Sequence, residues 1–400
     1  MTTAANRLPA LDLLRGAAVA GMILVTSPGD WASTYSQLRH ADWNGWTAAD
    51  MVFPVFLFSV GAALGFSFPR PLGDADAQRQ YWWRVGRRVV ALILLGVALE
   101  ASYNLAIGLG AWFPGKAGLE NLRIPGILQR IALCYGLCAI LLWVIARRAA
   151  DGLFHLNVRA ITAAILVVLI GYWALLNFVP VPGYGAGRLD VEGNLPGYVD
   201  RMVFGVSHLW PLGNVSWGQP VFYDPEGLLS TFPAATNCLF GVLAALLWRR
   251  NPARAALILA LSGAALVALG LLLDPVFAIN KRIWTSSFAL LSSGVAAVAF
   301  AALAVAANST AAARLLSPLR VLGGNAILAF IIATLFGRVY GAPLIGAGDA
   351  RMSPASWLDH GIQRFVGDPY AASLLCAAAV LALITLALWP LHRRAIHFRL

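Results

Sequence analysis

Long apolar runs, separated by shorter polar segments, recur along the whole chain. A run of about twenty apolar residues is long enough to cross a bilayer as a helix. The pattern predicts about ten such spans, at residues 8–25, 47–68, 85–106, 124–146, 158–179, 228–248, 253–273, 283–306, 319–338 and 371–391. The first run is charged and lacks a small-residue cleavage site, so we expect it to remain as a helix. The chain is therefore predicted to be an all-α polytopic membrane protein, with residues 1–400 forming one transmembrane domain.

The polar segments differ between the two sides of the predicted membrane. An even number of spans places both termini on one side, and most of the 29 Lys and Arg residues fall on that side. Because basic residues concentrate in cytoplasmic loops, we expect both termini to be cytoplasmic. The outer loops are long and rich in aromatic residues, Gly and Pro, and the loop 180–227 is predicted to fold over the outer face as a lid. Functional residues are expected on that side.

Composition agrees with this topology and argues against several classes of protein. The 400 residues are 60% hydrophobic and only 12% charged, unlike a soluble domain. The net charge of +11 comes largely from Arg residues at the ends of apolar runs, so we assign it to topology and anionic membrane lipids, not to nucleic acid. All four cysteines lie in apolar runs without a CxxC pair, so neither a disulfide framework nor a metal site is predicted.

The stretch RHADWNGWTAADMVFPVFLFSVG, residues 39–61, holds the strongest candidate for chemistry. His40 is the group in it whose ordinary pKa lies near neutrality, so it is the natural candidate to move protons or to carry a group. Asp42 and Asp50 are close enough in sequence to orient the ring or to raise its basicity, as a general base or a nucleophile requires. An exposed loop histidine without a role is the alternative.

Three further polar or aromatic residues are candidate substrate contacts. Trp43 could stack on a sugar ring, or it could anchor the loop at the membrane interface. Asn44, the next residue in the loop, is the second candidate substrate contact. Asn325 lies in LGGNAILAF, where the glycines permit close backbone approach and the amide could donate a hydrogen bond to a ligand.

Charged and amide side chains also enter the predicted spans. Gln129 and Arg130 belong to the fourth span, where such residues face a polar cavity or a partner. We expect them, together with Arg123, to line a cavity, and a salt bridge to Glu100 is the alternative for a buried arginine. Glu226 lies just before the sixth span, where it is either a binding residue or an acid that suits the positive end of the helix.

Asp12 and Arg15 form a second charged pair, inside the first span. Their i, i+3 spacing puts them on one face of a helix, where they can neutralise each other. The sequence leaves open whether this ion pair is structural or catalytic.

Motifs of several soluble enzyme classes are absent from the sequence. It contains no GxSxG, no HExxH, no GxxxxGK[ST] and no GxGxxG after a strand. This argues against a serine hydrolase and against an ATP-driven pump.

Six segments carry a resemblance to a known family. They read LDLLRG, HADWNGWTAADMVFPVFLFSVG, RIPGILQRIALCY, YDPEGLLST, NKRIWTSSFAL and LGGNAI. In this order and spacing they resemble the transmembrane acetyltransferases typified by heparan-alpha-glucosaminide N-acetyltransferase and its bacterial relatives. The resemblance runs from about residue 11 to residue 327, and the segment that contains His40 is its most specific part.

The resemblance implies an activity and a location. An acetyl group from cytosolic acetyl-CoA would pass to the amine of a glucosamine or glucosaminide on the periplasmic side of a bacterial inner membrane. It maps the essential histidine of the family onto His40, which would act as a base or carry the acetyl group. Thr26 and Ser27 stand where relatives often carry Asn. A hydroxyl can replace an amide as a hydrogen-bond donor but reaches less far, so the sequence leaves open whether this position stabilises an oxyanion.

Two other functions remain as alternatives. Bacterial relatives are also linked to N-acetylglucosamine uptake, so an amino-sugar transporter is the leading one. An O-acyltransferase that modifies lipid or envelope components is the other. The sequence leaves open the acceptor, the location of the CoA site and whether the protein is a homodimer.

Overall fold

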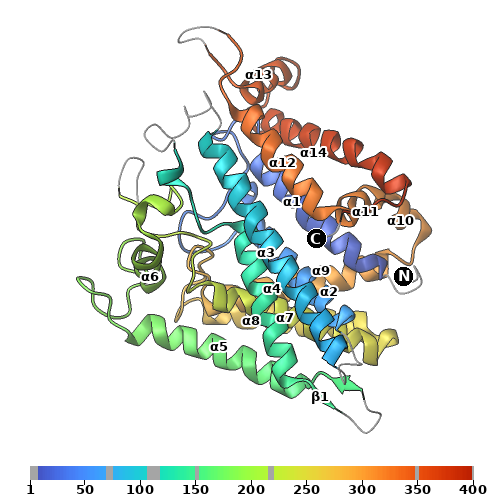
Figure 1. Cartoon of the computed structure of the whole chain (residues 1–400). Coiled ribbons are helices and arrows are strands. Elements are labelled where there is room, and N and C mark those ends of the chain that lie inside the picture. The colour runs from blue at the N-terminus through green and yellow to red at the C-terminus, as the bar shows by residue number, and fades with distance from the viewer. Residues whose placement is uncertain are drawn as a thin grey trace.

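The computed structural model describes residues 8–68, 75–105, 118–148, 153–214, 220–346 and 351–398. These residues form a bundle of α-helices, with loops and short helices gathered at its ends (Figure 1). The helices are α1 (Pro9–Thr26), α2 (Ala48–Ser67), α3 (Ala75–Leu105), α4 (Ile127–Ile145), α5 (Val158–Phe178), α6 (Leu195–Phe204), α7 (Thr231–Arg250), α8 (Pro252–Leu273), α9 (Ser286–Ala306), α10 (Thr310–Leu315), α11 (Ser317–Gly324), α12 (Ala326–Gly341), α13 (Pro354–Val366) and α14 (Pro369–Arg393). The 3₁₀ helices are η2 (Ser36–Leu38), η4 (Leu119–Asn121) and η5 (Val206–His208), and strands β1 (Arg147–Arg148) and β2 (Phe154–His155) pair antiparallel.

The predicted fold class, an all-α polytopic membrane protein, is confirmed. Among the described residues, eight helices are long and apolar enough to cross a membrane: α1, α2, α4, α5, α7, α8, α9 and α14. The third predicted span, 85–106, overlaps α3, and its last residue lies outside the described residues. The ninth, 319–338, is wrong as a continuous helix, because it is divided between α11 and α12, which are bent by 89°. Counting this pair as one span gives up to nine candidates in the described part of the chain.

Asn325 explains the bend between α11 and α12. Its backbone leaves helical geometry, with φ of −131° and ψ of 43°. Its side chain donates a hydrogen bond to Ile396 O at 3.1 Å and accepts one from Phe398 N at 2.7 Å. These two bonds tie the break to the C-terminal tail, 71 residues further along the chain. Hydropathy stays high across the bend, so the apolar pattern alone does not show it.

Glycines allow the central helices to approach closely. Gly61 on α2 lies against Cys238 on α7, where a Cβ atom would stand 1.8 Å from the Cys238 carbonyl oxygen. Gly16 on α1 faces Leu319 on α11 in the same way. Small residues at such positions are typical of helix packing in membranes, where van der Waals contact drives association. These contacts fix α1 and α2, and with them the two ends of the loop that carries His40.

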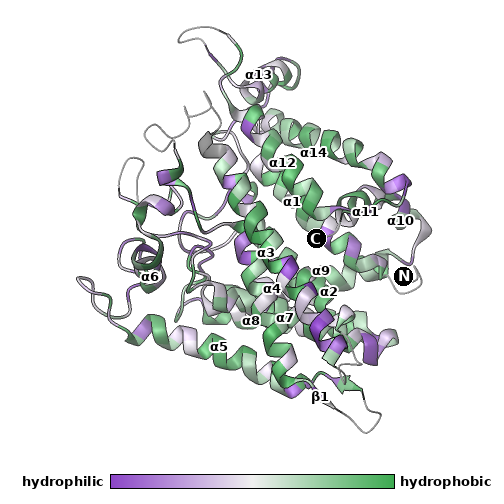
Figure 2. Cartoon of the chain, viewed as in Figure 1, coloured by the Kyte–Doolittle hydropathy of each residue, from purple (hydrophilic) through white to green (hydrophobic). Residues whose placement is uncertain are grey.

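The outer surface of the bundle is apolar. Figure 2 shows hydrophobic residues along the long helices, with more hydrophilic positions toward the ends of several of them. In the most apolar 18 residues of α5 and α8, only 28% and 17% of the residues are buried, so these two helices expose much of their length. Exposed apolar area of this extent indicates a lipid-facing surface.

The loops predicted to be inner and outer gather on opposite sides. The start of α1, α10 and the β1–β2 hairpin lie to the right and lower right of Figure 1, whereas α6 and the loops beside it lie to the left. The predicted lid, 180–227, is described except for residues 215–219. It contains α6, which is capped by Asn194, and its Asp200 accepts a hydrogen bond from Leu228 N at 2.8 Å, just before α7. The assignment of one side as cytoplasmic stays a prediction.

Candidate active site

His40 lies in the loop between α1 and α2, and the first turn of α2 holds its ring. Nδ1 lies 2.9 Å from Asp50 Oδ1. Asp50 is 1% exposed, and its Oδ2 accepts hydrogen bonds from the backbone N–H groups of Ala41 and Thr47, at 3.1 and 3.0 Å. The bond to Thr47 belongs to a capping box at the start of α2. The carboxylate that helps to start the helix therefore also contacts the imidazole.

Lys281 joins this pair from the turn between α8 and α9. Its Nζ lies 3.0 Å from His40 Nδ1 and 3.3 Å from Asp50 Oδ1, and we call these three residues the His40 cluster. The His40 side chain remains 34% exposed. Burial, together with the Lys281 ammonium, lowers the pKa of His40, and burial also lowers the pKa of Lys281. The imidazole is therefore uncharged over most of the neutral pH range.

Sequence reasoning did not assign Lys281 to the site. It lies in NKRIW, directly before an apolar run, where a lysine ordinarily marks the membrane interface. Its contact with His40 joins residues that are 241 positions apart. Only the turn before α9 brings them together, so the sequence carried no specific signal for the contact.

The neighbours predicted to contact substrate, Trp43 and Asn44, also hold the loop in place. Trp43 Nε1 donates a hydrogen bond to Leu189 O at 2.8 Å, which ties the loop to the predicted lid. The Asn44 side-chain oxygen accepts a hydrogen bond from the Asn280 amide at 3.0 Å, so it fastens the loop to the turn that carries Lys281. Asp42 is exposed, and the hydrogen bond to the imidazole is made by Asp50.

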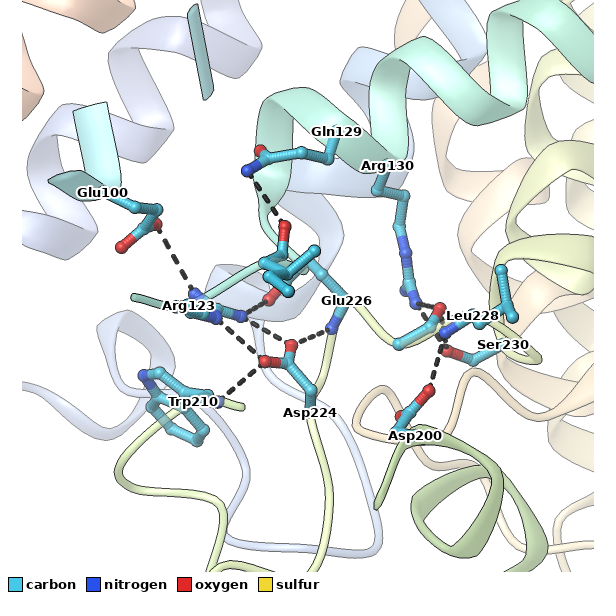
Figure 3. Close-up of polar contacts among 12 residues, drawn as sticks. Glu100, Arg123, Gln129, Arg130, Asp200, Trp210, Asp224, Glu226, Leu228 and Ser230 are labelled. Atoms are coloured by element: carbon cyan, nitrogen blue, oxygen red, sulfur yellow. Dashed lines mark hydrogen bonds and ion pairs between the residues drawn. The ribbon is translucent and has the colours of Figure 1, made fainter. Parts of the chain in front are cut away.

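A second polar centre surrounds Arg123 (Figure 3). Arg123 Nε and Nη2 bind the two oxygens of Asp224 at 2.9 and 2.6 Å, and Nη2 also binds Glu226 at 2.5 Å. Glu100 Oε1 lies 3.9 Å from Nη1, and we call these four residues the Arg123 network. Burial opposes the charge of Arg123, but Asp224 and Glu226 raise its pKa well above the ordinary value. Glu226 is thus engaged in an ion pair, and the N-cap residue of α7 is Ser230.

Gln129 and Arg130 leave the start of α4 in different directions (Figure 3). Gln129 donates a hydrogen bond to Ile124 O at 3.1 Å and lines a cavity, as expected. Arg130 is completely buried, donates to Gly227 O at 2.7 Å and to the Ser230 hydroxyl, and lies over the ring of Trp284. It does not line either of the two adjoining cavities that contain Arg15 and Trp31. The alternative of a salt bridge from Arg130 to Glu100 is wrong, because Glu100 lies beside Arg123.

Two adjoining cavities run through the bundle. The Arg15 cavity, of about 260 Å³, is lined by Arg15, Arg88, Phe53 and Phe398 among others. The Trp31 cavity, of about 500 Å³, is lined by Thr26, Trp31, Glu100 and Gln129 among others. Both include Met22, Ile127, Leu128 and Phe330, so they meet at these side chains.

The His40 cluster lines neither cavity, but it lies close to one wall. Phe53, less than one helical turn after Asp50, lines the Arg15 cavity. Its ring packs edge-on against Trp284, with 5.6 Å between ring centroids. Trp284 follows Lys281 by three residues, and the backbone N–H of Trp284 donates to Lys281 O at 3.1 Å. A wall of two aromatic rings therefore adjoins both the cavity and the turn that carries Lys281.

The remaining predicted residues lie near the Arg15 cavity. Arg15 Nη1 and Asp12 Oδ1 are 3.6 Å apart, so the i, i+3 pair forms as the helical spacing requires. Asn325 is 1% exposed, and its amide binds the C-terminal tail, which places Phe398 in the cavity lining. Arg88 contributes a buried Nε that has no hydrogen-bond partner among the described residues. These arginines are suited to hold an anionic group at this end of the cavity.

The arrangement around His40 supports proton transfer or acyl transfer by the imidazole. Among the described residues, no group of three or more His, Cys, Asp and Glu side chains could hold a metal ion. If the Nδ1 proton is donated to Asp50, the lone pair on Nε2 is available as a base or a nucleophile. This is the chemistry that a neutral, partly exposed imidazole held by a carboxylate can perform.

Comparison with known proteins agrees with the resemblance seen in the motifs. No family model matches the chain. It is 30% identical over 315 residues to heparan-alpha-glucosaminide N-acetyltransferase of Homo sapiens, covering 70% of this chain and 46% of the relative. It is 29% identical over 319 residues to the protein of the same name from Mus musculus, covering 72% and 47%. The chain thus spans about half the length of these curated relatives. It belongs to the family of heparan-alpha-glucosaminide N-acetyltransferase.

Proposed function

We propose that the protein is a transmembrane acetyltransferase that moves an acetyl group from cytosolic acetyl-CoA to the amine of a glucosamine-type sugar. The periplasmic side of a bacterial inner membrane is the proposed location of the acceptor. The observation that carries the proposal is the His40 imidazole, held at 2.9 Å by Asp50 at the end of a membrane bundle. Burial lowers the pKa of this imidazole, which favours its uncharged form. The named activity of the two mammalian relatives supports the reaction class.

The Arg15 cavity is the proposed place for the donor. Acetyl-CoA combines an anionic phosphate-bearing end with a long, mainly uncharged arm. The cavity offers Arg15 and the unpartnered Nε of Arg88 among apolar side chains, so its residues fit such a molecule. Phe53 lines this cavity and packs against Trp284, three residues after Lys281, so this wall is the proposed route from the donor to the His40 cluster.

The proposed role of His40 follows from Nε2, the ring nitrogen that does not contact Asp50. In direct transfer, Nε2 takes a proton from the acceptor nitrogen while that nitrogen bonds to the thioester carbonyl carbon. The C–S bond then breaks, and the proton passes from His40 to the CoA sulfur. In the two-step alternative, Nε2 attacks the thioester carbonyl carbon, the C–S bond breaks and CoA leaves as its thiolate. The acceptor amine then displaces the imidazole from the acetyl group, and the proton that the amine loses passes to the CoA thiolate. Asp50 holds the same ring tautomer in both routes.

Labelled acetyl transfer tests this function. Purified protein in proteoliposomes is given radiolabelled acetyl-CoA on one side and glucosamine or a glucosaminide on the other. We expect labelled N-acetyl product from the wild-type protein and a loss of about 10²–10⁴-fold in the His40→Asn variant. His360→Asn, which changes an exposed histidine in α13, is the matched control and should transfer normally. Full transfer by His40→Asn would contradict the proposed role.

The adjoining cavities favour a second candidate, an amino-sugar transporter. Two cavities that meet inside the bundle resemble the midplane sites of transporters. This function predicts uptake of labelled N-acetylglucosamine into proteoliposomes without acetyl-CoA, and uptake that survives in His40→Asn. Acetylated product without uptake would exclude it. Acceptors that offer only hydroxyl groups test the O-acyltransferase alternative in the same assay.

A further inference from the structure

Lys281 makes the closest cationic contact with the proposed base. Its Nζ lies 3.0 Å from Nδ1 and 3.4 Å from Nε2 of His40, so the ammonium approaches the edge of the ring that holds both nitrogens. The same Nζ lies 3.3 Å from Asp50 Oδ1. The lysine therefore touches both the imidazole and the carboxylate that orients it.

The turn before α9 holds Lys281 rigidly. Thr285 N donates to Asn280 O at 3.0 Å, and Trp284 N donates to Lys281 O at 3.1 Å. Trp284 has a φ of 51°, a left-handed conformation that is costly for a bulky residue. Its buried side chain keeps this conformation through a hydrogen bond from Nε1 to Asn237 Oδ1 at 3.0 Å. A strained backbone held by its surroundings is common at functional sites.

The same turn is fastened to the loop that carries His40. Gly45 N donates to Ile279 O at 2.7 Å, and the Asn280 amide donates to Asn44 Oδ1 at 3.0 Å. These bonds fix the distance between the two segments independently of Lys281. The contact between Lys281 and His40 is therefore imposed by the fold, and it is not the chance meeting of two flexible side chains.

The charges around the ring oppose one another. Asp50 on α2 favours the protonated imidazole, whereas Lys281 and Arg282 on the turn disfavour it. Glu226 faces Lys281 from the segment before α7 and favours its ammonium form. A cation within about 4–6 Å lowers the basicity of a histidine that a carboxylate alone would raise.

We infer that Lys281 is a positioning residue for the proposed transfer: it holds Asp50 in place and keeps the His40 imidazole uncharged and ready to accept a proton. The inference rests on the proposed function. Without the lysine, the Asp50–His40 pair alone would favour imidazolium, which has no lone pair for the acceptor proton. With the lysine present, Asp50 still selects the tautomer of the His40 ring, and Lys281 partly neutralises the negative charge of Asp50.

Reaction with diethyl pyrocarbonate tests this inference independently of catalysis, because a histidine side chain reacts with it as neutral imidazole and not as imidazolium. Modification of the His40 peptide is followed by mass spectrometry from pH 5 to 8 in full-length protein. We expect the midpoint to rise by about 1 pH unit in Lys281→Met. Lys281→Arg, which keeps the positive charge, should retain the wild-type midpoint. Equal midpoints in wild-type and Lys281→Met, or equal shifts in both variants, would overturn the inference.

The acetyl-transfer assay separates this inference from the proposed function. If the wild-type protein transfers acetyl groups, the acidic limb of kcat/KM against pH should move to higher pH in Lys281→Met, by the same amount as the modification midpoint. If it transfers none while the midpoint still shifts, the proposed function fails and the charge effect of Lys281 stands. A loss of activity without any shift of either curve would identify a merely structural lysine.

Discussion

The Arg123 network and the His40 cluster combine acids and bases in similar ways but differ in how completely they are satisfied. The Arg123 side chain is 12% exposed. Its Nε and Nη2 donate to Asp224, and Nη2 also donates to Glu226. His40 is 34% exposed, and only one of its two ring nitrogens is engaged with Asp50. A fully paired cation stabilises structure, whereas a partly exposed imidazole with an available nitrogen can react.

The two centres also differ in the direction in which their surroundings shift the pKa of the central base. The acids around Arg123 raise its pKa, so its charge is fixed at every accessible pH. Burial and Lys281 lower the pKa of His40, so the ring gives up its charge more readily than an ordinary histidine. Removal of Arg123 should therefore affect folding first, and removal of His40 should affect chemistry first.

The largest effect is expected from Arg123→Met. It leaves Asp224 and Glu226 as buried, uncompensated carboxylates, which should lower the free energy of unfolding by about 3–5 kcal/mol. Thermal unfolding in detergent micelles measures the change. Arg188→Met is the matched control, because its ion pair with Asp190 is exposed and should change the unfolding temperature little.

His40→Asn, measured in the same way, completes the comparison. It should unfold within a few degrees of the wild-type protein while its acetyl transfer is lost. A large loss of stability in His40→Asn, or none in Arg123→Met, would contradict the division of the molecule into a structural and a reactive polar centre.

Asp200 sharpens the comparison, because it is a buried acid without complete pairing. One oxygen accepts from Leu228 N, whereas Oδ2 has no hydrogen-bond partner, and burial raises the pKa to about 7. Between its ordinary pKa of 3.8 and about 7, the folded state binds more protons than the unfolded state. Stability should therefore fall as pH rises through this window, by up to about 4 kcal/mol, and level off above it.

Unfolding temperatures from pH 5 to 8 test this sign. Asp200→Asn should flatten the dependence and be the more stable protein at pH 8. Asp190→Asn, in the same segment but exposed, should keep the wild-type slope. A wild-type stability that rises with pH through this window would show that Asp200 is ionised in the folded protein.

A smaller effect should separate the two acids near His40. Asp50→Asn removes the carboxylate that binds Nδ1 and should lower acetyl transfer by about 10–100-fold, because the ring loses its preferred tautomer. Asp42→Asn changes an exposed side chain and should stay within about twofold of wild type. Initial rates at saturating acetyl-CoA make the comparison. Equal losses in the two variants would remove Asp50 from its proposed role.

The parts of the structure that the sequence predicts well are those set by local pattern. Apolar runs located the long helices, and the i, i+3 spacing of Asp12 and Arg15 produced their ion pair. The bend at Asn325 and the contact of Lys281 with His40 depend on residues 71 and 241 positions away. Hydropathy and spacing carry no information on such contacts, so only the folded chain shows which polar residues are satisfied and which remain available.

The smallest effect is expected where the reactive loop meets the predicted lid. Trp43→Phe loses the hydrogen bond to Leu189 O but keeps a ring that can pack against Tyr223. A neutral hydrogen bond contributes about 0.5–1.5 kcal/mol, so the lid should loosen without unfolding. If the segment 180–227 holds the acceptor, KM for the sugar should rise by about 2–10-fold while kcat and the KM for acetyl-CoA stay unchanged. A fall in kcat alone would instead place Trp43 with the His40 cluster, because a residue that only shapes the lid has no interaction specific to the transition state.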